Sequence, residues 1–375
     1  MGHDNRVPLK VQLLDPSAFT PPYDHALAAA LARAGADVEL LTSRFLYGPA
    51  PREEGYRVNE AFYRRTARRG LEAPGRRFGK LAEHVPDMLH ARSLTASADV
   101  VHWQWVTVPG LDAALLPPKR PRAYTVHYPL PRSRVAVARE RALMRRMDAV
   151  FIHTESGARA LRERIGVEAR RVHVVPHGAF DYLTRLPEER PLPRELAEVE
   201  GPVVLCFGLL RPYKGIDVLI EAFREIEACE LWIVGMPRMP IEPLEELARR
   251  SGARVRFVPR FVTDPEIPGF FRRADVVVLP HREIEQSGVL YTALAFGKPI
   301  VASAVGGFVD IGEAGGATLV PPGDAAALGA ELARLIGDDE ARRALGEAAA
   351  ALAANTYSWD SIAARTLAIY RELGA

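Results

Sequence analysis

The sequence is poor in the features that mark secreted, membrane-spanning or highly charged proteins. Two cysteines, Cys206 and Cys229, occur among 375 residues, and neither has a second cysteine at metal-ligand spacing. A disulfide framework is therefore excluded, and we expect reduced thiols in a cytoplasmic protein. No stretch approaches the run of about 18 apolar residues that crosses a membrane, and we expect no signal peptide, because residues 1–10 lack an apolar core. The net charge of +2 implies no general polyelectrolyte partner.

What the sequence contains is a regular alternation of short apolar stretches and helical patterns. Expected strands lie at 9–14, 37–42, 99–103, 123–126, 149–153 and 172–175 and, after a Pro-, Glu- and Arg-rich linker, at 203–207, 230–234, 254–258, 275–279, 299–302 and 317–320. Expected helices lie at 24–34, 80–96, 133–146, 156–165, 215–226, 240–251, 264–273, 288–296, 324–336 and 359–373. This alternation predicts two doubly wound parallel sheets with ligands at the carboxyl ends of their strands.

A short basic turn opens the second half of the pattern. The apolar stretch 202–207 runs into Gly208, Arg211 and Lys214 follow, and Gly215 begins a helical pattern. A helix N-terminus offers free N–H groups and partial positive charge, and two cations complete a clamp for a diphosphate. An ordinary surface turn explains the same spacing equally well, so the other motifs must decide.

A series of motifs in the second half occurs in an order and spacing that resembles the retaining glycosyltransferases of family 4. They are Arg211-Pro212-Tyr213-Lys214-Gly215-Ile216-Asp217, Glu285-Gln286-Ser287-Gly288-Val289-Leu290, Ala295-Phe296-Gly297-Lys298-Pro299, Val305-Gly306-Gly307 and Val320-Pro321-Pro322-Gly323-Asp324. The resemblance covers nearly the whole chain and is strongest over 203–324. It implies the α/β architecture called GT-B, in which two Rossmann-like doubly wound domains face a central cleft.

The resemblance also implies how the chain is divided. Residues 1–185 would form an N-terminal acceptor-binding domain, and residues 186–357 a C-terminal domain that holds the nucleotide sugar. The last helix, 358–375, would pack back on the N-terminal domain.

The donor site follows from the same resemblance. Arg211 and Lys214 would contact the diphosphate and stabilise charge on the departing nucleotide, while Gly208 and Gly235 let the backbone approach the ligand closely. The loop Arg260-Phe261-Val262 would hold the base, although a plain connection explains it equally well. The polar turn Gln286-Ser287-Gly288-Val289 at a helix start would offer N–H groups to phosphate or sugar hydroxyls.

The stretch 281–299 departs from the family pattern. Relatives often carry glutamates at the positions of Ile284 and Thr292, and both are absent here. Glu283 and Glu285 flank the first position, and either can face the sugar. We place Glu283 with the catalytic residues and Glu285 with the donor-binding residues.

The acceptor side rests on fewer residues. His127 follows the strand expected at 123–126, where a lone histidine is more often structural. The resemblance implies that it contacts the transferred sugar, so we predict a catalytic role. Pro22, Tyr23, Trp103 and Trp105 lie at two other strand ends and are predicted to receive the acceptor.

A basic stretch at 57–80 interleaves cations with apolar residues. It contains Arg57, Arg64, Arg65, Arg68, Arg69, Arg76, Arg77 and Lys80, together with Phe62, Tyr63, Leu71 and Phe78. A solvated helix face explains such a run, and so does peripheral contact with an anionic membrane, which would suit a lipid-linked acceptor. No nucleic-acid-binding module accompanies the charge. We therefore expect a cytoplasmic bacterial protein, with the inner membrane face as an alternative location.

These predictions combine in one function. We expect a retaining glycosyltransferase that moves a hexosyl unit from a UDP- or GDP-linked sugar to a hydroxyl acceptor in glycan, glycolipid or glycoconjugate synthesis. No histidine pair has metal-ligand spacing with a carboxylate, so we expect no metal and no other cofactor. Two alternatives stay open: a GT-B phosphorylase or sugar-nucleotide epimerase, and a non-catalytic nucleotide-sugar-binding protein, which the missing glutamate at 292 favours.

Overall fold

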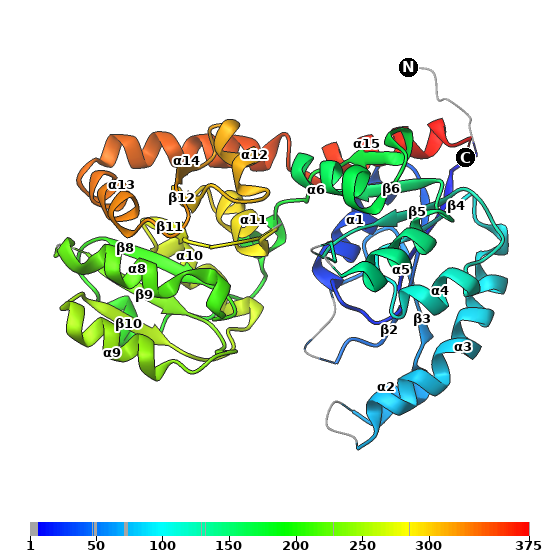
Figure 1. Cartoon of the computed structure of the whole chain (residues 1–375), viewed down its shortest axis with the longest axis horizontal. Coiled ribbons are helices and arrows are strands. Elements are labelled where there is room, and N and C mark those ends of the chain that lie inside the picture. The colour runs from blue at the N-terminus through cyan, green and yellow to red at the C-terminus, as the bar shows by residue number, and fades with distance from the viewer. Residues whose placement is uncertain are drawn as a thin grey trace. The chain divides into compact units, whose positions relative to one another are not determined.

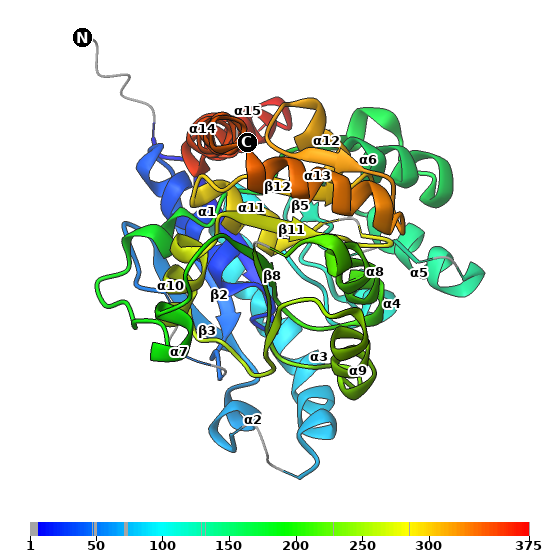
Figure 2. The same cartoon turned by 90° about the vertical axis from the view of Figure 1, so that its left-hand side faces the viewer.

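The computed structural model describes residues 7–46, 48, 51–70, 74–128, 130–131, 133–227, 229–284 and 286–374. The chain forms two compact units, each a sheet with helices on both faces (Figures 1 and 2). Unit 1 consists of Met1–Pro176 and Trp359–Ala375, and unit 2 of His177–Ser358. The predicted α/β fold with two parallel sheets is confirmed.

Unit 1 is built from seven strands and the helices that connect them. Its strands are β1 (Lys10–Asp15), β2 (Asp37–Ser43), β3 (Arg57–Phe62), β4 (Val100–Trp103), β5 (Arg122–Thr125), β6 (Ala149–Ile152) and β7 (Val172–Val174). Its helices are α1 (Pro21–Arg33), α2 (Arg64–Arg68), α3 (Arg76–Leu94), α4 (Pro109–Leu115), α5 (Arg134–Met144), α6 (Glu155–Ala160) and α15 (Trp359–Glu372).

Unit 2 repeats the plan with six strands. They are β8 (Val203–Phe207), β9 (Glu230–Val234), β10 (Val255–Val258), β11 (Val276–Leu279), β12 (Ile300–Ser303) and β13 (Thr318–Val320). The helices are α7 (Arg194–Ala197), α8 (Ile216–Ala222), α9 (Glu242–Ser251), α10 (Ile267–Arg273), α11 (Gly288–Ala295), α12 (Phe308–Glu313), α13 (Ala325–Gly337) and α14 (Asp339–Ala354).

The strand order of each sheet locates the expected binding edge. The orders are β3-β2-β1-β4-β5-β6-β7 and β10-β9-β8-β11-β12-β13, and every pairing of these strands is parallel. The order therefore reverses direction between β1 and β4 in unit 1 and between β8 and β11 in unit 2. Ligands bind outside the carboxyl ends of strands at such switch points.

The break between the units falls between Pro176 and His177, earlier than the expected boundary after residue 185. Residues 177–185 belong to unit 2 because they pack on its helices. The ring of His177 stacks on Tyr291 with centroids 4.3 Å apart, and the Ala179 N–H donates to the Tyr357 carbonyl at 2.8 Å.

The last helix, α15, packs against α1 within unit 1 (Figure 1). Ile362 and Tyr370 of α15 are fully buried in the cluster that contains Leu27 and Leu31 of α1. The Tyr370 hydroxyl also lies 2.5 Å from His102 Nδ1 at the end of β4. Burying each large apolar side chain contributes about 1.5–3 kcal/mol, so α15 is an integral part of unit 1.

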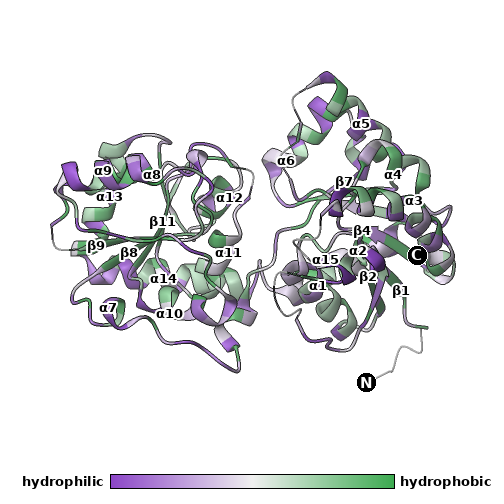
Figure 3. Ribbon diagram, turned by 90° about the horizontal axis from the view of Figure 1, so that it is seen from below, coloured by the Kyte–Doolittle hydropathy of each residue, from purple (hydrophilic) through white to green (hydrophobic). Residues whose placement is uncertain are grey.

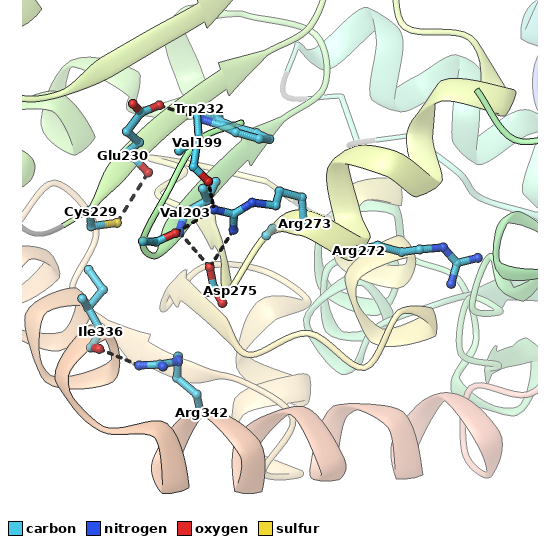
Figure 4. Close-up of polar contacts among 12 residues, drawn as sticks. Val199, Val203, Cys229, Glu230, Trp232, Arg272, Arg273, Asp275, Ile336 and Arg342 are labelled. Carbon is cyan, nitrogen blue, oxygen red and sulfur yellow. Dashed lines mark hydrogen bonds and ion pairs between the residues drawn. The ribbon is translucent and has the colours of Figure 1, made fainter. Parts of the chain in front are cut away.

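The amino edge of the unit 2 sheet is closed by polar contacts (Figure 4). The Arg273 guanidinium donates to the carbonyls of Val199 and Gly201 and pairs with Asp275. Asp275 in turn accepts the N–H of Val203, the first residue of β8. These groups satisfy one another, so this edge is structural and the opposite, carboxyl edge is left for ligands.

The hydropathy of the chain follows the layers. The strands are mostly apolar, while the helices carry polar residues on their outer faces (Figure 3). Among the helices that the structure describes, none combines the length and apolarity required to cross a bilayer.

Candidate functional site

The basic turn predicted from the sequence lies at the carboxyl end of β8. Lys214 ends a 3₁₀ turn, Pro212–Lys214, and only 5% of its surface is exposed. Its Nζ donates to the Phe207 carbonyl at 2.9 Å, which holds the ammonium group beside Gly208. Burial lowers the pKa of Lys214, and Arg211 lowers it further. A cation held in such a dry place interacts strongly with any anion that reaches it.

Glycines let backbone segments lie against this turn. A Cβ on Gly235 would lie 2.1 Å from the Gly208 carbonyl oxygen, and a Cβ on Gly215 would lie 2.1 Å from the Pro280 carbonyl oxygen. Gly208, Gly215 and Gly235 all have positive φ angles, which side chains disfavour. The ends of β8, β9 and β11 are thereby brought within backbone contact.

Arg282 holds the turn from the β11 side. Its guanidinium pairs with Asp217 at 2.5 Å and donates to the Pro212 carbonyl at 3.0 Å. Its N–H donates to the Tyr213 carbonyl at 2.8 Å. Arg211, by contrast, is exposed and makes no side-chain hydrogen bond or ion pair among the described residues, so its guanidinium is available to a ligand.

The start of α11 lies over Gly208. Val289 Cγ2 would be 3.0 Å from a Cβ on Gly208, and Ser287 is buried while Gly288 is exposed. Thr292 donates its hydroxyl to the Gly288 carbonyl at 2.9 Å. The residue that replaces the family glutamate is therefore buried and bonded to its own helix. The position supplies no carboxylate to a ligand.

The other predicted ligand-facing residues of this stretch are Glu283, Glu285 and Gln286. Gln286 has a buried Nε2 without a hydrogen-bond partner in the part of the chain that the structure describes. Glu283 is exposed. Glu285 lies outside the described residues, so the choice between the two glutamates stays a prediction.

The loop after β10 divides into structural and exposed residues. Arg260 pairs with Glu266 at 2.8 Å and donates to the Phe261 carbonyl, so its guanidinium braces the loop. Val262 is buried in the core, so its side chain faces away from a ligand, and a backbone contact from this residue to the donor stays a prediction. Phe261 is 53% exposed and is the residue of this loop that can offer a ring to a base.

His281 was not singled out by the sequence reasoning. It follows β11, is 1% exposed, and neither ring nitrogen has a hydrogen-bond partner among the described residues. Burial and the neighbouring Lys214 lower its pKa to about 3, so the imidazole is neutral and adds no charge beside the lysine. Its place directly after a central strand is the signal that could have identified it.

At the carboxyl end of β1, one carboxylate shapes the loop that follows. Asp15 accepts the N–H groups of Ser17, Phe19 and Thr20. Thr20 then accepts a hydrogen bond from Trp105 Nε1 at 2.7 Å. This contact joins the loop after β1 to the loop after β4, across the switch point of unit 1.

His127 lies in the same cluster and is held on several sides. Its Nε2 is 3.1 Å from the Gln104 side chain, and its Nδ1 is 3.3 Å from His153 Nε2. Its ring stacks on Trp105, with centroids 5.3 Å apart and an interplanar angle of 15°. Burial lowers the pKa of His153 to about 4, so this neighbour is neutral. Sequence reasoning found His127 and Trp105 but missed Gln104 and His153.

Two predicted acceptor residues are in the core instead. Trp103 is fully buried, because β4 is central in the sheet and both of its faces are covered. Tyr23 is 3% exposed and contacts the rings of His127 and Trp359. Direct contact of Trp103 with an acceptor is therefore wrong, and Tyr23 acts at most by supporting His127. Pro22 is half-buried in the first turn of α1.

The basic stretch is not one continuous face. Arg57–Phe62 is the edge strand β3, and Phe62 and Tyr63 are buried. Phe78, in the first turn of α3, is 80% exposed. Leu71 lies outside the described residues. Within the described residues, no group of three or more His, Cys, Asp or Glu side chains is arranged to hold a metal ion.

Comparison with protein families gives two matches. Residues 201–338 match the family described as "Glycosyl transferases group 1", and residues 23–179 match "Glycosyltransferase Family 4". A D-inositol 3-phosphate glycosyltransferase of Xylanimonas cellulosilytica is 29% identical over 92% of this chain and 89% of its own length. A GDP-mannose:glycolipid 4-beta-D-mannosyltransferase of Xanthomonas campestris is 31% identical over 44% of this chain and 45% of its own length.

Solved structures show the same architecture. Sucrose-phosphate synthase from Thermosynechococcus elongatus superposes with a TM-score of 0.73 at 21% identity, covering 98% of this chain and 99% of that one. The Anabaena protein HepE, solved in complex with UDP, gives 0.73 at 20% identity and covers 97% and 100%. At these identities the likeness shows the fold, which is the GT-B fold predicted above.

Proposed function

We propose, because this chain belongs to the family 4 (group 1) glycosyltransferases, that it moves a hexosyl unit from a UDP- or GDP-linked sugar to a hydroxyl acceptor. That it is a glycosyltransferase follows from the family; the nucleotide donor, the hexosyl unit and retention of the anomeric configuration are the proposal. The observation that carries the proposal is the buried Lys214 at the end of β8, which has no carboxylate partner among the described residues. A desolvated cation beside glycine backbone suits a diphosphate.

In this proposal the diphosphate is held by two kinds of donor. Lys214 and Arg211 supply positive charge, and the N–H groups at the start of α11, around Ser287 and Gly288, supply hydrogen bonds. As the bond between the anomeric carbon and the phosphate oxygen breaks, negative charge grows on the leaving diphosphate. These groups are in place before that charge develops, so they stabilise it without rearranging.

The acceptor side is proposed to lie at the carboxyl edge of unit 1. His127 contacts the transferred sugar, and the half-buried Trp105 offers a ring to the acceptor. The acceptor oxygen forms the new bond to the anomeric carbon from the face that the diphosphate leaves, and a diphosphate oxygen takes the hydroxyl proton. These roles are supported by the hydrogen bonds and the ring stacking that hold His127 in place.

Two further parts of the proposal concern location and metal. We propose a cytoplasmic protein that touches an anionic membrane through 57–80, supported by the exposed Phe78 beside the exposed Arg77 on α3. The similar mannosyltransferase has a glycolipid in its name, and such an acceptor would be reached at a membrane surface. We also propose that no metal takes part, since side-chain cations and N–H groups can neutralise the diphosphate.

A ligand screen followed by product analysis tests this function. The melting temperature of the intact protein is measured with UDP, GDP, ADP and their sugars, because a ligand that binds the native state raises it by mass action. We expect UDP or GDP with its sugar to stand out, with or without EDTA. With the preferred donor, proton NMR of the product should show the anomeric configuration of the donor. Inversion, or no stabilisation by any nucleotide, would contradict the proposal.

A further inference from the structure

A pair of cationic cavities lies in unit 1, and neither is lined by His127 or by the residues that hold it. The outer cavity, of about 340 Å³, is lined by Arg44, Glu60, Phe62, Arg64, Ala67 and Arg68. The inner one is small, about 20 Å³, and its walls include Ser17, Arg44, Tyr63, Arg76 and Lys80. Arg44 and Ala67 line both cavities. Arg44 directly follows β2, so this feature sits at the carboxyl edge of the unit 1 sheet.

The cations of the cavities lack carboxylate partners within the part of the chain that the structure describes. Among the described residues, none of Arg44, Arg68, Arg76 and Lys80 forms an ion pair with a carboxylate, although arginines elsewhere commonly do, as Arg57 does with Asp37. Arg76 also has a buried Nε without a hydrogen-bond partner among these residues. Of the residues with described positions, Glu60 is the one acidic side chain in the wall of the outer cavity, and no acidic side chain lines the inner cavity.

The charges of the inner cavity also act on one another. Burial lowers the pKa of Lys80, and the nearby Arg76 lowers it further, whereas Asp15 opposes the shift. Lys80 Nζ lies 4.7 Å from the centre of the Tyr63 ring, which fixes the ammonium group in place. Like charges gathered in a half-buried pocket repel one another, and an anion bound between them relieves that repulsion.

A buried chain of hydrogen bonds supplies a positioned hydroxyl in the same wall. Tyr63 Oη lies 2.7 Å from His84 Nδ1, and His84 Nε2 lies 2.5 Å from the Asp112 carboxylate. Thr107 Oγ1 is 3.2 Å from both Tyr63 Oη and Ser17 Oγ. Ser17 belongs to the loop after β1 that is bonded to Trp105, so the cavity adjoins the proposed acceptor region.

We propose that a phosphate-class anionic group carried by the acceptor binds in the outer cavity where it meets the inner one, with Arg44, which lines both, and Arg76 and Lys80 of the inner wall as its cationic contacts. This inference rests on the proposed function, because it assigns one end of the same acceptor. The hydroxyl end would lie near Trp105 and His127 and the anionic end near Arg44. A phosphorylated soluble acceptor and a lipid with a phosphate headgroup share this chemistry, and the test separates them.

The first experiment is a calorimetric titration of inorganic phosphate into the intact protein, with the preferred nucleoside diphosphate present at saturation so that the donor site is filled. We expect Arg76→Ala and Arg44→Ala each to weaken phosphate binding about tenfold, which corresponds to about 1.4 kcal/mol, because each removes a charge-assisted hydrogen bond. Arg77→Ala is the matched control, because Arg77 is exposed beside Arg76 and lines neither cavity. Arg44→Lys, which keeps the charge, should restore part of the binding.

The outcomes separate the two proposals. If the nucleotide binds and phosphate does not, or if Arg77→Ala weakens phosphate binding as much as Arg76→Ala, the anion site is wrong and the proposed function stands. If no nucleotide binds, the proposed function itself fails. Melting curves of each variant show whether it folds.

A second measurement identifies the source of the phosphate. The protein is floated with phosphatidylcholine vesicles that contain or lack phosphatidylglycerol. For a lipid headgroup, Arg76→Ala should reduce binding to the anionic vesicles, whereas Arg249→Ala, which removes an exposed arginine of α9 paired with Glu246, should not. For a soluble acceptor, Arg76→Ala should instead raise KM selectively for phosphorylated sugar acceptors. A variant that changes neither measurement would overturn the assignment.

Discussion

The carboxyl edges of the two sheets are built from different materials. In unit 2 the edge is mostly backbone, where Gly208, Gly215 and Gly235 let neighbouring loops approach closely. Its positive charge comes from the buried Lys214 and the exposed Arg211. In unit 1 the edge consists of interlocked side chains, with His127 held by Gln104, His153 and Trp105. An edge made of backbone suits the part of a ligand that many enzymes have in common, such as a diphosphate. An edge made of side chains can change the ligand that it binds when those side chains are substituted.

The largest expected effect comes from removing the buried cation of unit 2. We predict that Lys214→Ala lowers the rate of sugar transfer about 10²–10³-fold, as the loss of a preorganised charge contact does elsewhere. Steady-state assays of nucleotide release measure this effect. Arg249→Ala, an exposed arginine on α9 that pairs with Glu246, is the control and should be fully active. Wild-type activity of Lys214→Ala would show that the carboxyl edge of unit 2 does not depend on this charge.

The backbone character of the unit 2 edge is tested through its glycines. Gly235 has φ +143° and no room for a Cβ beside the Gly208 carbonyl, so Gly235→Ala should lower the free energy of unfolding of unit 2 by about 3 kcal/mol. Gly252 also has a positive φ but nothing within 4 Å of a Cβ. Gly252→Ala should cost about 1 kcal/mol, and urea unfolding compares the two. Equal costs would mean that close approach at this edge is unimportant.

The exposed ring of the base loop has a smaller expected effect. Phe261→Ala should weaken donor binding about tenfold, because stacking on a base contributes about 1–3 kcal/mol, and it should leave stability unchanged. Phe261→Tyr keeps the ring and should bind normally. Titration calorimetry with the preferred nucleotide sugar measures both. Normal binding by the alanine variant would show that the base lies elsewhere.

The buried imidazoles of unit 1 predict a modest dependence of stability on pH. Burial lowers the pKa of His102 to about 3 and that of His153 to about 4, against an ordinary value of 6.5. Between these pKa values and pH 6.5 the two imidazoles are protonated in the unfolded chain but neutral in the folded protein. The free energy of unfolding should therefore be highest above pH 6.5 and fall as the pH drops toward the folded pKa values. Each such histidine contributes up to about 1.4 kcal/mol per pH unit.

The variant His102→Asn should therefore lose less stability than the wild type between pH 6.5 and about pH 5, although it is less stable overall because the contact with Tyr370 changes. Equilibrium unfolding at several pH values gives the two slopes. Parallel slopes would show that His102 is not kept neutral by the fold.

The accuracy of the sequence-based prediction also differs between the two edges. Gly208, Arg211 and Lys214 could be found because a short motif encodes their backbone geometry. Trp103 and Trp105 could not be told apart, since the end of a buried strand is set by its neighbours in the sheet. Gln104 and His153 directly follow the separate strands β4 and β6, and the parallel pairing of β4, β5 and β6 brings them beside His127.

The sequence patterns missed the strand β3 and the helices α2, α4, α7, α12 and α14, and β3 and α14 show why. The edge strand β3 has a polar composition and pairs with β2 alone, so its residues looked like part of a basic helix face. Helix α14 begins at the Asp338 cap directly after α13, and the pattern of 324–336 gave no sign that a second helix followed. Both depend on contacts that local sequence does not record.

The most direct test of the division between the two edges compares donor binding with sugar transfer in two proteins. We predict that Arg211→Ala combined with Lys214→Ala abolishes calorimetrically measurable donor binding. His127→Ala should bind the nucleotide sugar with wild-type affinity and transfer the sugar far more slowly. Unchanged donor binding in the double variant, or loss of donor binding in His127→Ala with transfer intact, would contradict the account.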